Sequence, residues 1–95
     1  MTVLRLKVQI DAGNAVVVVG RAAWALLELL AAGHAGCTYV DTPAPRWSSY
    51  IHKLRKLGAI IDTLREGHGG PFAGFHARYV LRSSVTVLEI IGGAS

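Results

Sequence analysis

The chain is poor in cysteine and in charged residues, and it has no long apolar run. Its one cysteine, Cys37, cannot form an internal disulfide and is too few for a cysteine-based zinc knuckle, which suits a reducing cytosol. The longest apolar stretches, residues 15–19 and 22–27, are far shorter than the roughly 20 residues that span a bilayer. Arg5 and Lys7 interrupt the apolar N-terminal segment, unlike in a secretion signal. We therefore expect a soluble, cytoplasmic protein with no membrane partner.

The composition is that of one small folded domain. Apolar residues make up 52% of the 95 residues and charged residues 17%, the opposite of the balance that keeps chains disordered. A chain of this length has no room for separate cofactor and substrate lobes. We expect residues 1–95 to form a single domain.

The net charge of +4 is concentrated in the second half of the chain. Residues 1–45 contain three basic and three acidic residues, whereas residues 46–82 contain seven basic and two acidic ones. Such an asymmetry is typical of a surface that meets a polyanion. Lysine and arginine scattered for solubility would explain the count equally well, so the position of the charges on the elements has to decide.

The first third of the chain predicts a hairpin and a helix. Residues 4–10 alternate between apolar and polar, residues 11–14 form a turn signal, and residues 15–19 are rich in β-branched side chains. These patterns predict an N-terminal β-hairpin over residues 1–19. Residues 21–32 then show a helical apolar period that Gly33 closes.

Two prolines shape the next segment. Thr38 is a candidate N-cap for a short helical turn, but Pro43 and Pro45 prevent that turn from continuing. Pro45 is suited to the first position of a further helix, where its missing N–H is not needed. The sequence predicts that helix over residues 45–57, ended by Gly58.

The predicted helix 45–57 has an apolar stripe and a polar face without acidic residues. Successive residues are rotated by about 100°, which gathers the apolar side chains into one stripe. That stripe contains Trp47, Tyr50, Ile51, Leu54 and Leu57, and the polar face contains Ser48, Ser49, His52, Lys53, Arg55 and Lys56. Solvent-exposed helix faces usually carry both signs of charge, so this face favours an anionic partner.

The last third predicts strands. Residues 59–64 and 75–82 have strand patterns, and the glycine-rich residues 66–74 between them predict a projecting hairpin. A break at residues 83–84 precedes a last apolar strand over Val85–Ile91. The partner of this strand is either the first hairpin or a second copy of the chain.

The order of these elements is hairpin, helix, helical turn, basic helix, strand, glycine-rich tip and strand. Residues 46–63 follow the pattern apolar-x-x-Leu-Arg-x-x-Gly-x-x-Ile within RWSSYIHKLRKLGAIIDT, and residues 76–81 are HARYVL. Over residues 20–82 the chain resembles small bacterial and phage winged-helix DNA-binding domains, whose recognition helix, following strand and returning wing strand have similar sequences. The resemblance implies an α+β fold: a winged helix-turn-helix with an N-terminal β-hairpin, a β-hairpin wing, and residues 83–95 as a C-terminal strand and tail. The chain departs from the family in its second helix, which normally has two full turns, so the docking angle of helix 45–57 is open.

Under this resemblance, helix 45–57 would lie in the major groove of duplex DNA. The side chains opposite the apolar stripe would face the base edges, the flanking cations would contact phosphates, and the wing would follow the backbone or enter a minor groove. The base-facing residues are Ser48, Ser49, His52 and Lys56, the phosphate-facing residues are Arg46, Lys53 and Arg55, and the wing residues are Arg65, His68, His76 and Arg78. Arg55 has an equal alternative, a pair with Asp62 or Glu66 that would brace the wing.

Two function classes stay open at this stage. The first is a duplex DNA-binding protein, a transcriptional regulator or a DNA-binding factor of a phage or mobile element. The second is a winged-helix adaptor that binds proteins and not DNA. A homodimer through Val85–Ile91 or through hairpin edges is compatible with both.

No motif in the chain predicts catalysis, a metal or a cofactor. His34 and Cys37 have a ligand-like gap without a second pair, and they lack the oxyanion donors and third group of a nucleophilic site. A phosphate cradle needs a helix after its glycine-rich loop, whereas a strand follows here. Trp24, Trp47 and Tyr50 have core spacing, which favours burial over base stacking. We therefore expect a protein that is not an enzyme, with no metal site and no cofactor.

Overall fold

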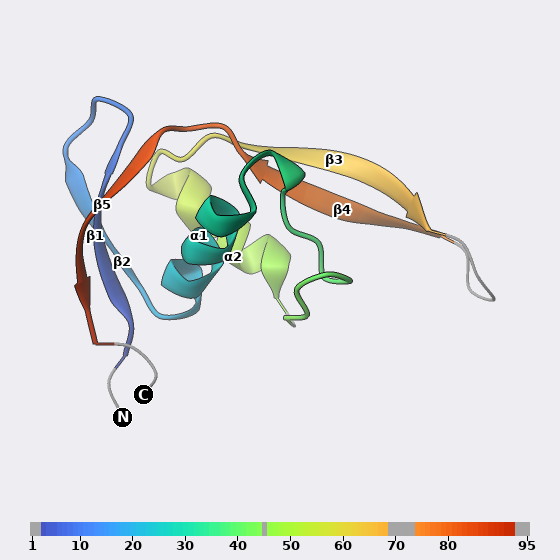
Figure 1. The fold of residues 1–95 in the computed structure, drawn as a ribbon, viewed down its shortest axis with the longest axis horizontal. Helices are drawn as coiled ribbons and strands as arrows, with labels where there is room; N and C mark the ends of the chain where they lie inside the picture. The colour runs from blue at the N-terminus through green and yellow to red at the C-terminus, as the bar shows by residue number, and fades with distance from the viewer. Residues whose placement is uncertain (1–2, 45, 69–73, 93–95) are drawn as a thin grey trace.

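The computed structural model describes residues 3–44, 46–68 and 74–92, except for the side chain of His68. In this part of the chain the elements follow the order β1 (Arg5–Ile10), β2 (Ala15–Val19), α1 (Arg21–Ala32), the 3₁₀ helix η1 (Gly33–Ala35), α2 (Trp47–Lys56), β3 (Ile61–His68), β4 (Gly74–Leu81) and β5 (Val85–Ile91). Figure 1 shows the two α-helices between a sheet at one end and a long projecting hairpin at the other. Pro45 and residues 69–73 of the predicted hairpin tip lie outside the described residues. The helix predicted over residues 45–57 begins later, at Trp47, because its N-cap Arg46 has the non-helical dihedral angles φ −141° and ψ 46°.

The N-terminal sheet consists of three antiparallel strands in the order β2-β1-β5. Because side chains alternate along a strand, Leu6, Val8 and Ile10 of β1 face the interior, while Arg5 and Lys7 face solvent. The predicted first hairpin is confirmed by the β1–β2 register, which pairs residue 5 with 19 and residue 9 with 15. The open question about the last strand is also settled, since β5 pairs with β1 on the side away from β2.

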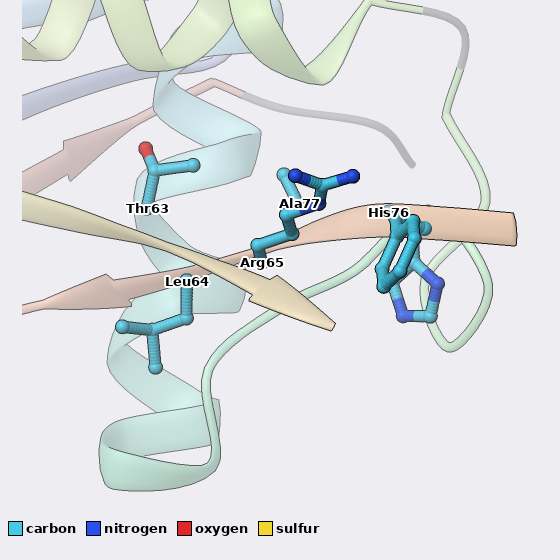
Figure 2. Close-up of a pocket in the computed structure, with 6 residues that line it drawn as sticks. Thr63, Leu64, Arg65, His76 and Ala77 are labelled. Atoms are coloured by element: carbon cyan, nitrogen blue, oxygen red, sulfur yellow. The ribbon is translucent and has the colours of Figure 1, made fainter. Parts of the chain in front are cut away.

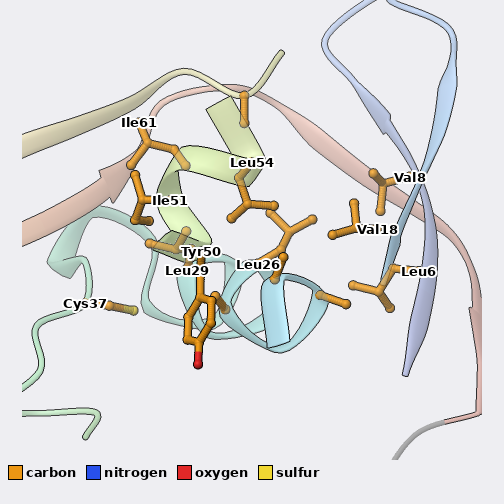
Figure 3. Packing of buried hydrophobic residues seen from close by; sticks show 14 of the residues in the cluster. Leu6, Val8, Val18, Leu26, Leu29, Cys37, Tyr50, Ile51, Leu54 and Ile61 are labelled. Carbon is orange, nitrogen blue, oxygen red and sulfur yellow. The ribbon is translucent and has the colours of Figure 1, made fainter. Parts of the chain in front are cut away.

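Both helices pack on the inner face of this sheet. Figure 3 shows Leu6, Val8 and Val18 pointing from the sheet toward Leu26 and Leu54. These five side chains are almost completely buried. Burial of each such side chain contributes about 1.5–3 kcal/mol, so this contact stabilises the packing of the helices on the sheet.

Among the described residues between α1 and α2, one helical turn follows η1. Thr38 Oγ1 accepts a hydrogen bond from the Asp41 N–H at 3.0 Å, and the Thr42 N–H donates to the Thr38 carbonyl at 2.9 Å. These bonds confirm Thr38 as the cap of a turn that the prolines limit. The helix-turn-helix therefore has a reduced middle element, a single turn over residues 38–42.

The wing is the antiparallel pair β3–β4, and it is longer than the sequence predicts. The register runs from residue 61 paired with 81 to residue 68 paired with 74, so Glu66, Gly67 and His68 belong to a strand and not to the tip. The expected tip at residues 66–74 is thus too long, because residues 66–68 continue the ladder opposite residues 74–76. At its base, Cys37 bridges to Tyr79 of β4 through two backbone hydrogen bonds of 2.9 Å.

Candidate nucleic-acid interface

The first part of the candidate interface is the exposed face of α2. Trp47, Tyr50, Ile51 and Leu54 are buried, as the apolar stripe predicts. Leu57 belongs to the predicted stripe but lies beyond the end of α2 and is 37% exposed. The remaining residues of the helix and its N-cap are all exposed: Arg46, Ser48, Ser49, His52, Lys53, Arg55 and Lys56. The first turn of α2 contains no acidic residue, and the last turn contains three cations.

The helical rotation orders these exposed side chains around α2. Ser49, His52 and Lys56 lie opposite the buried stripe, so they extend farthest from the body of the protein. Lys53 lies on one flank, where it and Lys56 border a groove beside β2. Arg55 lies on the other flank, toward the wing.

Arg55 joins the end of α2 to the start of the wing. Its Nη2 donates to the Ile61 carbonyl at 2.6 Å and to Thr63 Oγ1 at 2.8 Å, and its Nε donates to the same carbonyl at 3.2 Å. The alternative pair with Asp62 or Glu66 is therefore wrong in its partners, because those carboxylates bind Arg82 and Arg78. Arg55 braces the wing through a carbonyl and a hydroxyl group instead, so its positive charge is not neutralised by these contacts.

One face of the wing continues from this bracing contact. Thr63 and Arg65 are two residues apart on β3, so their side chains leave the same face of the hairpin, as Figure 2 shows. The Arg65 guanidinium lies 4.0 Å from the ring centroid of Phe75 on β4. The Phe75 side chain is 64% exposed and forms part of a shallow pocket with Thr63 and Arg65. The exposed Arg65 guanidinium is thus held against the exposed Phe75 ring. Both belong to the wing face whose Thr63 contacts Arg55 at the end of α2.

The other face of the wing is occupied by internal polar contacts. Arg78 donates from Nε to Glu66 Oε2 at 2.6 Å and from Nη2 to Glu66 Oε1 at 2.8 Å. It also donates to the Ala35 carbonyl at 2.8 Å and to Asp41 Oδ2 at 3.4 Å. The side chain of His76 is only 5% exposed, and its Nε2 lies 3.1 Å from Glu66 Oε1. These contacts fix the wing to the η1 segment.

This network shifts the acid–base equilibria of its members. Hydrogen bonds from Arg78 lower the pKa of Glu66 from 4.5 to about 2, and the hydrogen bond with His76 acts in the same direction. The same pairing with Glu66 raises the pKa of Arg78. Glu66 therefore stays ionised well below neutral pH.

The ion pairs divide the basic residues into two groups. Every ion pair in the described part of the chain involves Arg78, Arg82 or His76. The cations of α2 and the wing cation Arg65 have no acidic partner within 4.0 Å among the described residues. The positive charge that the sequence places in residues 46–82 is thus concentrated on α2 and one wing face.

The aromatic residues form a cluster between the helices and β4. The Trp24 and Trp47 rings are 5.4 Å apart, the Trp47 and Tyr79 rings are 6.2 Å apart, and Tyr50 packs edge-on against both tryptophans. Trp47 Nε1 donates to the Thr42 carbonyl at 2.8 Å, which satisfies its only polar group. The prediction that these aromatic residues belong to the core is confirmed for the buried Trp47 and Tyr50.

Two partners in the interface, Thr63 and Phe75, were not predicted from the sequence. Thr63 orients Arg55, and Phe75 supports Arg65. The period of two between residues 63 and 65 signals their common face, but the partner strand register that brings Phe75 close is visible only in the structure. The predicted wing residue His68 has a side chain outside the described part, so its role stays a prediction.

Two features are absent from residues 3–44, 46–68 and 74–92. No group of three or more His, Cys, Asp or Glu side chains there is arranged to hold a metal ion. None of the helices described is long and apolar enough to cross a membrane.

Comparison with known proteins identifies the fold family. A family model for a winged helix domain matches residues 15–91, from the start of β2 to the end of β5. Searches among curated proteins and among solved structures found no match. The matched residues cover most of the chain and include both helices and the wing, which agrees with the α+β architecture above. The chain belongs to the winged helix domain family.

Proposed function

We propose that this protein binds double-stranded DNA, with α2 in the major groove and the wing along the adjacent backbone. One observation carries the proposal: α2 and its N-cap Arg46 present an exposed face with four cations, two serines and a histidine but no acidic residue. Winged-helix and helix-turn-helix proteins place such a helix in the groove, which is about 12 Å wide. The partner expected for this face is therefore a polyanionic duplex.

The position of each side chain suggests its role in the complex. Ser49, His52 and Lys56 project farthest from the body and would reach base edges, together with Ser48. Arg46 and Lys53 lie at the rims of that face, where they would contact phosphates and fix the register of the helix.

The wing would add a second contact. Arg65 lies on the same wing face as Thr63, which holds Arg55 beside α2, so the three residues form a continuous border. A guanidinium supported by an aromatic ring suits a phosphate backbone or a narrow minor groove. We assign His76 and Arg78 to holding the wing and not to DNA, because Glu66 already engages both.

The biological role that we infer is regulation of transcription, or DNA binding for a phage or mobile element. This activity requires no catalytic group, metal or cofactor. The cytoplasmic location expected from the sequence stays a prediction.

The test measures the salt dependence of binding to a fluorescent duplex by anisotropy. About five phosphate contacts would give a slope near −4.5 in a plot of log affinity against log salt. Lys53→Gln with Lys56→Gln should lower duplex affinity and reduce the magnitude of this slope by about 0.9, because Lys53 contacts a phosphate whereas Lys56 faces a base edge. The matched control is Arg5→Gln with Lys7→Gln, which removes two exposed cations from the outer face of β1. The proposal would be refuted if both double variants lost duplex affinity equally, or if the wild type did not bind the duplex at low salt.

A second candidate property, self-association, has separate support. Among the described strands, β5 has β1 on one side and a free edge on the other. Leu88, Ile90 and Ile91 of β5 are 47–59% exposed, which is unusual for large apolar side chains on one strand. We propose that two copies pair through β5, which would also present two α2 helices to DNA.

A further inference from the structure

A groove outside the wing lies between β2 and the C-terminal end of α2. It has a volume of about 380 Å³, and its lining is mainly apolar. Ala22 and Leu57 contribute to its walls, and Val17 and Val19 of β2 form one side. The side chains of Val17 and Val19 lie on the outer face of the sheet, on the same face as their pair partners Lys7 and Arg5, so the groove meets β2 at its backbone edge. Leu57, which is 37% exposed, supplies accessible apolar surface to the lining.

The β2 side of the groove is a free strand edge. The Gly20 N–H donates to the Leu4 carbonyl at 2.7 Å, which fixes the direction of the backbone groups at this position. Backbone groups alternate along an antiparallel strand, so the groups of Val18 point toward β1 and those of Val17 and Val19 point away from it. Among the described strands none pairs with β2 on that side. Val17 and Val19 therefore offer two N–H and two carbonyl groups to an added strand.

The opposite rim of the groove is cationic. Lys53 and Lys56 border it from α2, both are exposed, and no acidic residue contributes to its lining. Neither lysine takes part in the ion pairs of the described residues. An acidic side chain that entered the groove would meet two ammonium groups with no internal competitor.

We propose that this groove binds an extended acidic peptide of a partner protein, which adds to β2 as a fourth strand. Strand addition obtains affinity from backbone hydrogen bonds and specificity from alternate side chains. Here the backbone bonds come from Val17 and Val19, the apolar floor accepts one or two aliphatic side chains, and the two lysines accept flanking carboxylates. The charge of the rim distinguishes this partner from β5 of a second copy, because β5 has a single acidic residue, Glu89.

The peptide and DNA would exclude each other. Lys53 and Lys56 belong to both the groove rim and the proposed DNA face, so one acidic ligand at a time can use them. This competition rests on the proposed function, whereas binding of the peptide itself does not. An acidic partner segment would thus release the protein from DNA.

The experiment titrates the ¹⁵N-labelled full chain with a capped synthetic peptide, Thr-Glu-Thr-Val-Thr-Val-Thr-Glu-Thr, and follows backbone amides by NMR. One face of the extended peptide carries its valines and glutamates. We expect saturable shifts at Val17, Val19, Lys53 and Leu57, and at least about tenfold weaker binding of a control peptide with lysine at both glutamate positions. Absence of shifts at Val17 and Val19 at about 1 mM peptide, or equal binding of both peptides, would overturn the inference.

Two variants separate this inference from the proposed function. Val17→Pro removes an edge N–H that β1 does not use, so it should abolish peptide binding and leave DNA binding intact. Lys53→Glu with Lys56→Glu should weaken both. Peptide binding without DNA binding would refute the proposed function alone, and the reverse result would refute this inference alone. If Val17→Pro instead converts a wild-type dimer into a monomer by light scattering, the groove is an interface between copies and the peptide inference is wrong.

Discussion

At the scale of single residues, Glu66 is the centre of the contacts that hold the wing. It accepts two hydrogen bonds from Arg78 and lies within 3.1 Å of His76 Nε2, although its sequence position suggests only a residue of the loop. The charges of residues 66 and 78 are evident in the sequence. Their meeting depends on a strand register that brings residue 66 opposite 76 and next to 78.

The pKa of Glu66 leads to a prediction about pH. Because this pKa is about 2 in the folded protein and 4.5 ordinarily, the pairing stabilises the fold fully above pH 4.5 and is lost as the pH falls toward 2. We expect the carboxyl carbon of Glu66 to titrate near pH 2 by NMR and the protection factors of wing amides against hydrogen exchange to fall below pH 4.5. In Arg78→Gln the titration should move toward 4.5. A wild-type midpoint near 4.5 would contradict the pairing.

Gly36 supports a second prediction at this scale. Its φ is +70°, and an added Cβ would lie 2.5 Å from the Tyr79 carbonyl oxygen, beside the bridge between Cys37 and Tyr79. Gly36→Ala should therefore lower the free energy of unfolding by about 2–3 kcal/mol, through backbone strain and displacement of β4. Gly33→Ala is the control, since Gly33 also has a positive φ but no atom within 4 Å of an added Cβ. The free energy of unfolding is measured by thermal unfolding. An equal decrease for both variants would contradict the close contact between Gly36 and Tyr79.

At the scale of elements, α2 and the wing differ in how much the sequence reveals. The apolar stripe and the glycine at residue 58 predict α2 to within two residues at each end. Strand β3 extends farther toward the tip than its apolar pattern, because backbone pairing continues through Glu66, Gly67 and His68. The exposed face of α2 is local in sequence, so it could be predicted. The Arg65–Phe75 contact joins two strands, so it could not be predicted from local sequence.

That contact yields a prediction for the wing as a DNA-binding element. Arg65→Gln should lower duplex affinity about three- to tenfold and reduce the salt slope by about 0.9, because one phosphate contact is lost. Phe75→Leu should give a smaller loss with almost unchanged thermal stability, since an exposed cation–π pair contributes about 0.5–1 kcal/mol. Arg82→Gln is the matched control, because Arg82 is paired with Asp62 at the wing base. The wing contact is refuted if Arg65→Gln and Arg82→Gln reduce affinity equally.

At the scale of the whole molecule, β5 closes the fold by returning to β1. This pairing joins the two ends of the described chain, and it leaves β2 and β5 as the two free edges of one sheet. The edges differ chemically: β2 lies beside a groove with a cationic rim, whereas β5 exposes large apolar side chains. The two edges therefore suit different partners.

Self-association through β5 can be tested by measuring the molecular mass of the protein in solution. We expect light scattering to give about twice the chain mass of 10.1 kDa at about 0.1 mM protein, because an unpaired apolar edge favours pairing with a second copy. Ile90→Lys should restore the single-chain mass with little change in thermal stability, because Ile90 is 59% exposed. The variant Val17→Pro should leave the dimer intact. A wild-type mass of one chain at this concentration would contradict the proposal.

The sequence by itself determined the elements, the apolar stripe of α2, the absence of acidic residues from its exposed face, and the limited turn after Thr38. These features depend on residues within a few positions of one another, where helical and strand periods and proline geometry act directly. Only the tertiary structure decided which cations keep their charge exposed. It paired Arg78 with Glu66 and Asp41, turned Arg55 to the Ile61 carbonyl and set Arg65 on Phe75. The physical reason is that these contacts join residues whose distance in space is set by sheet register and packing, which no local pattern specifies.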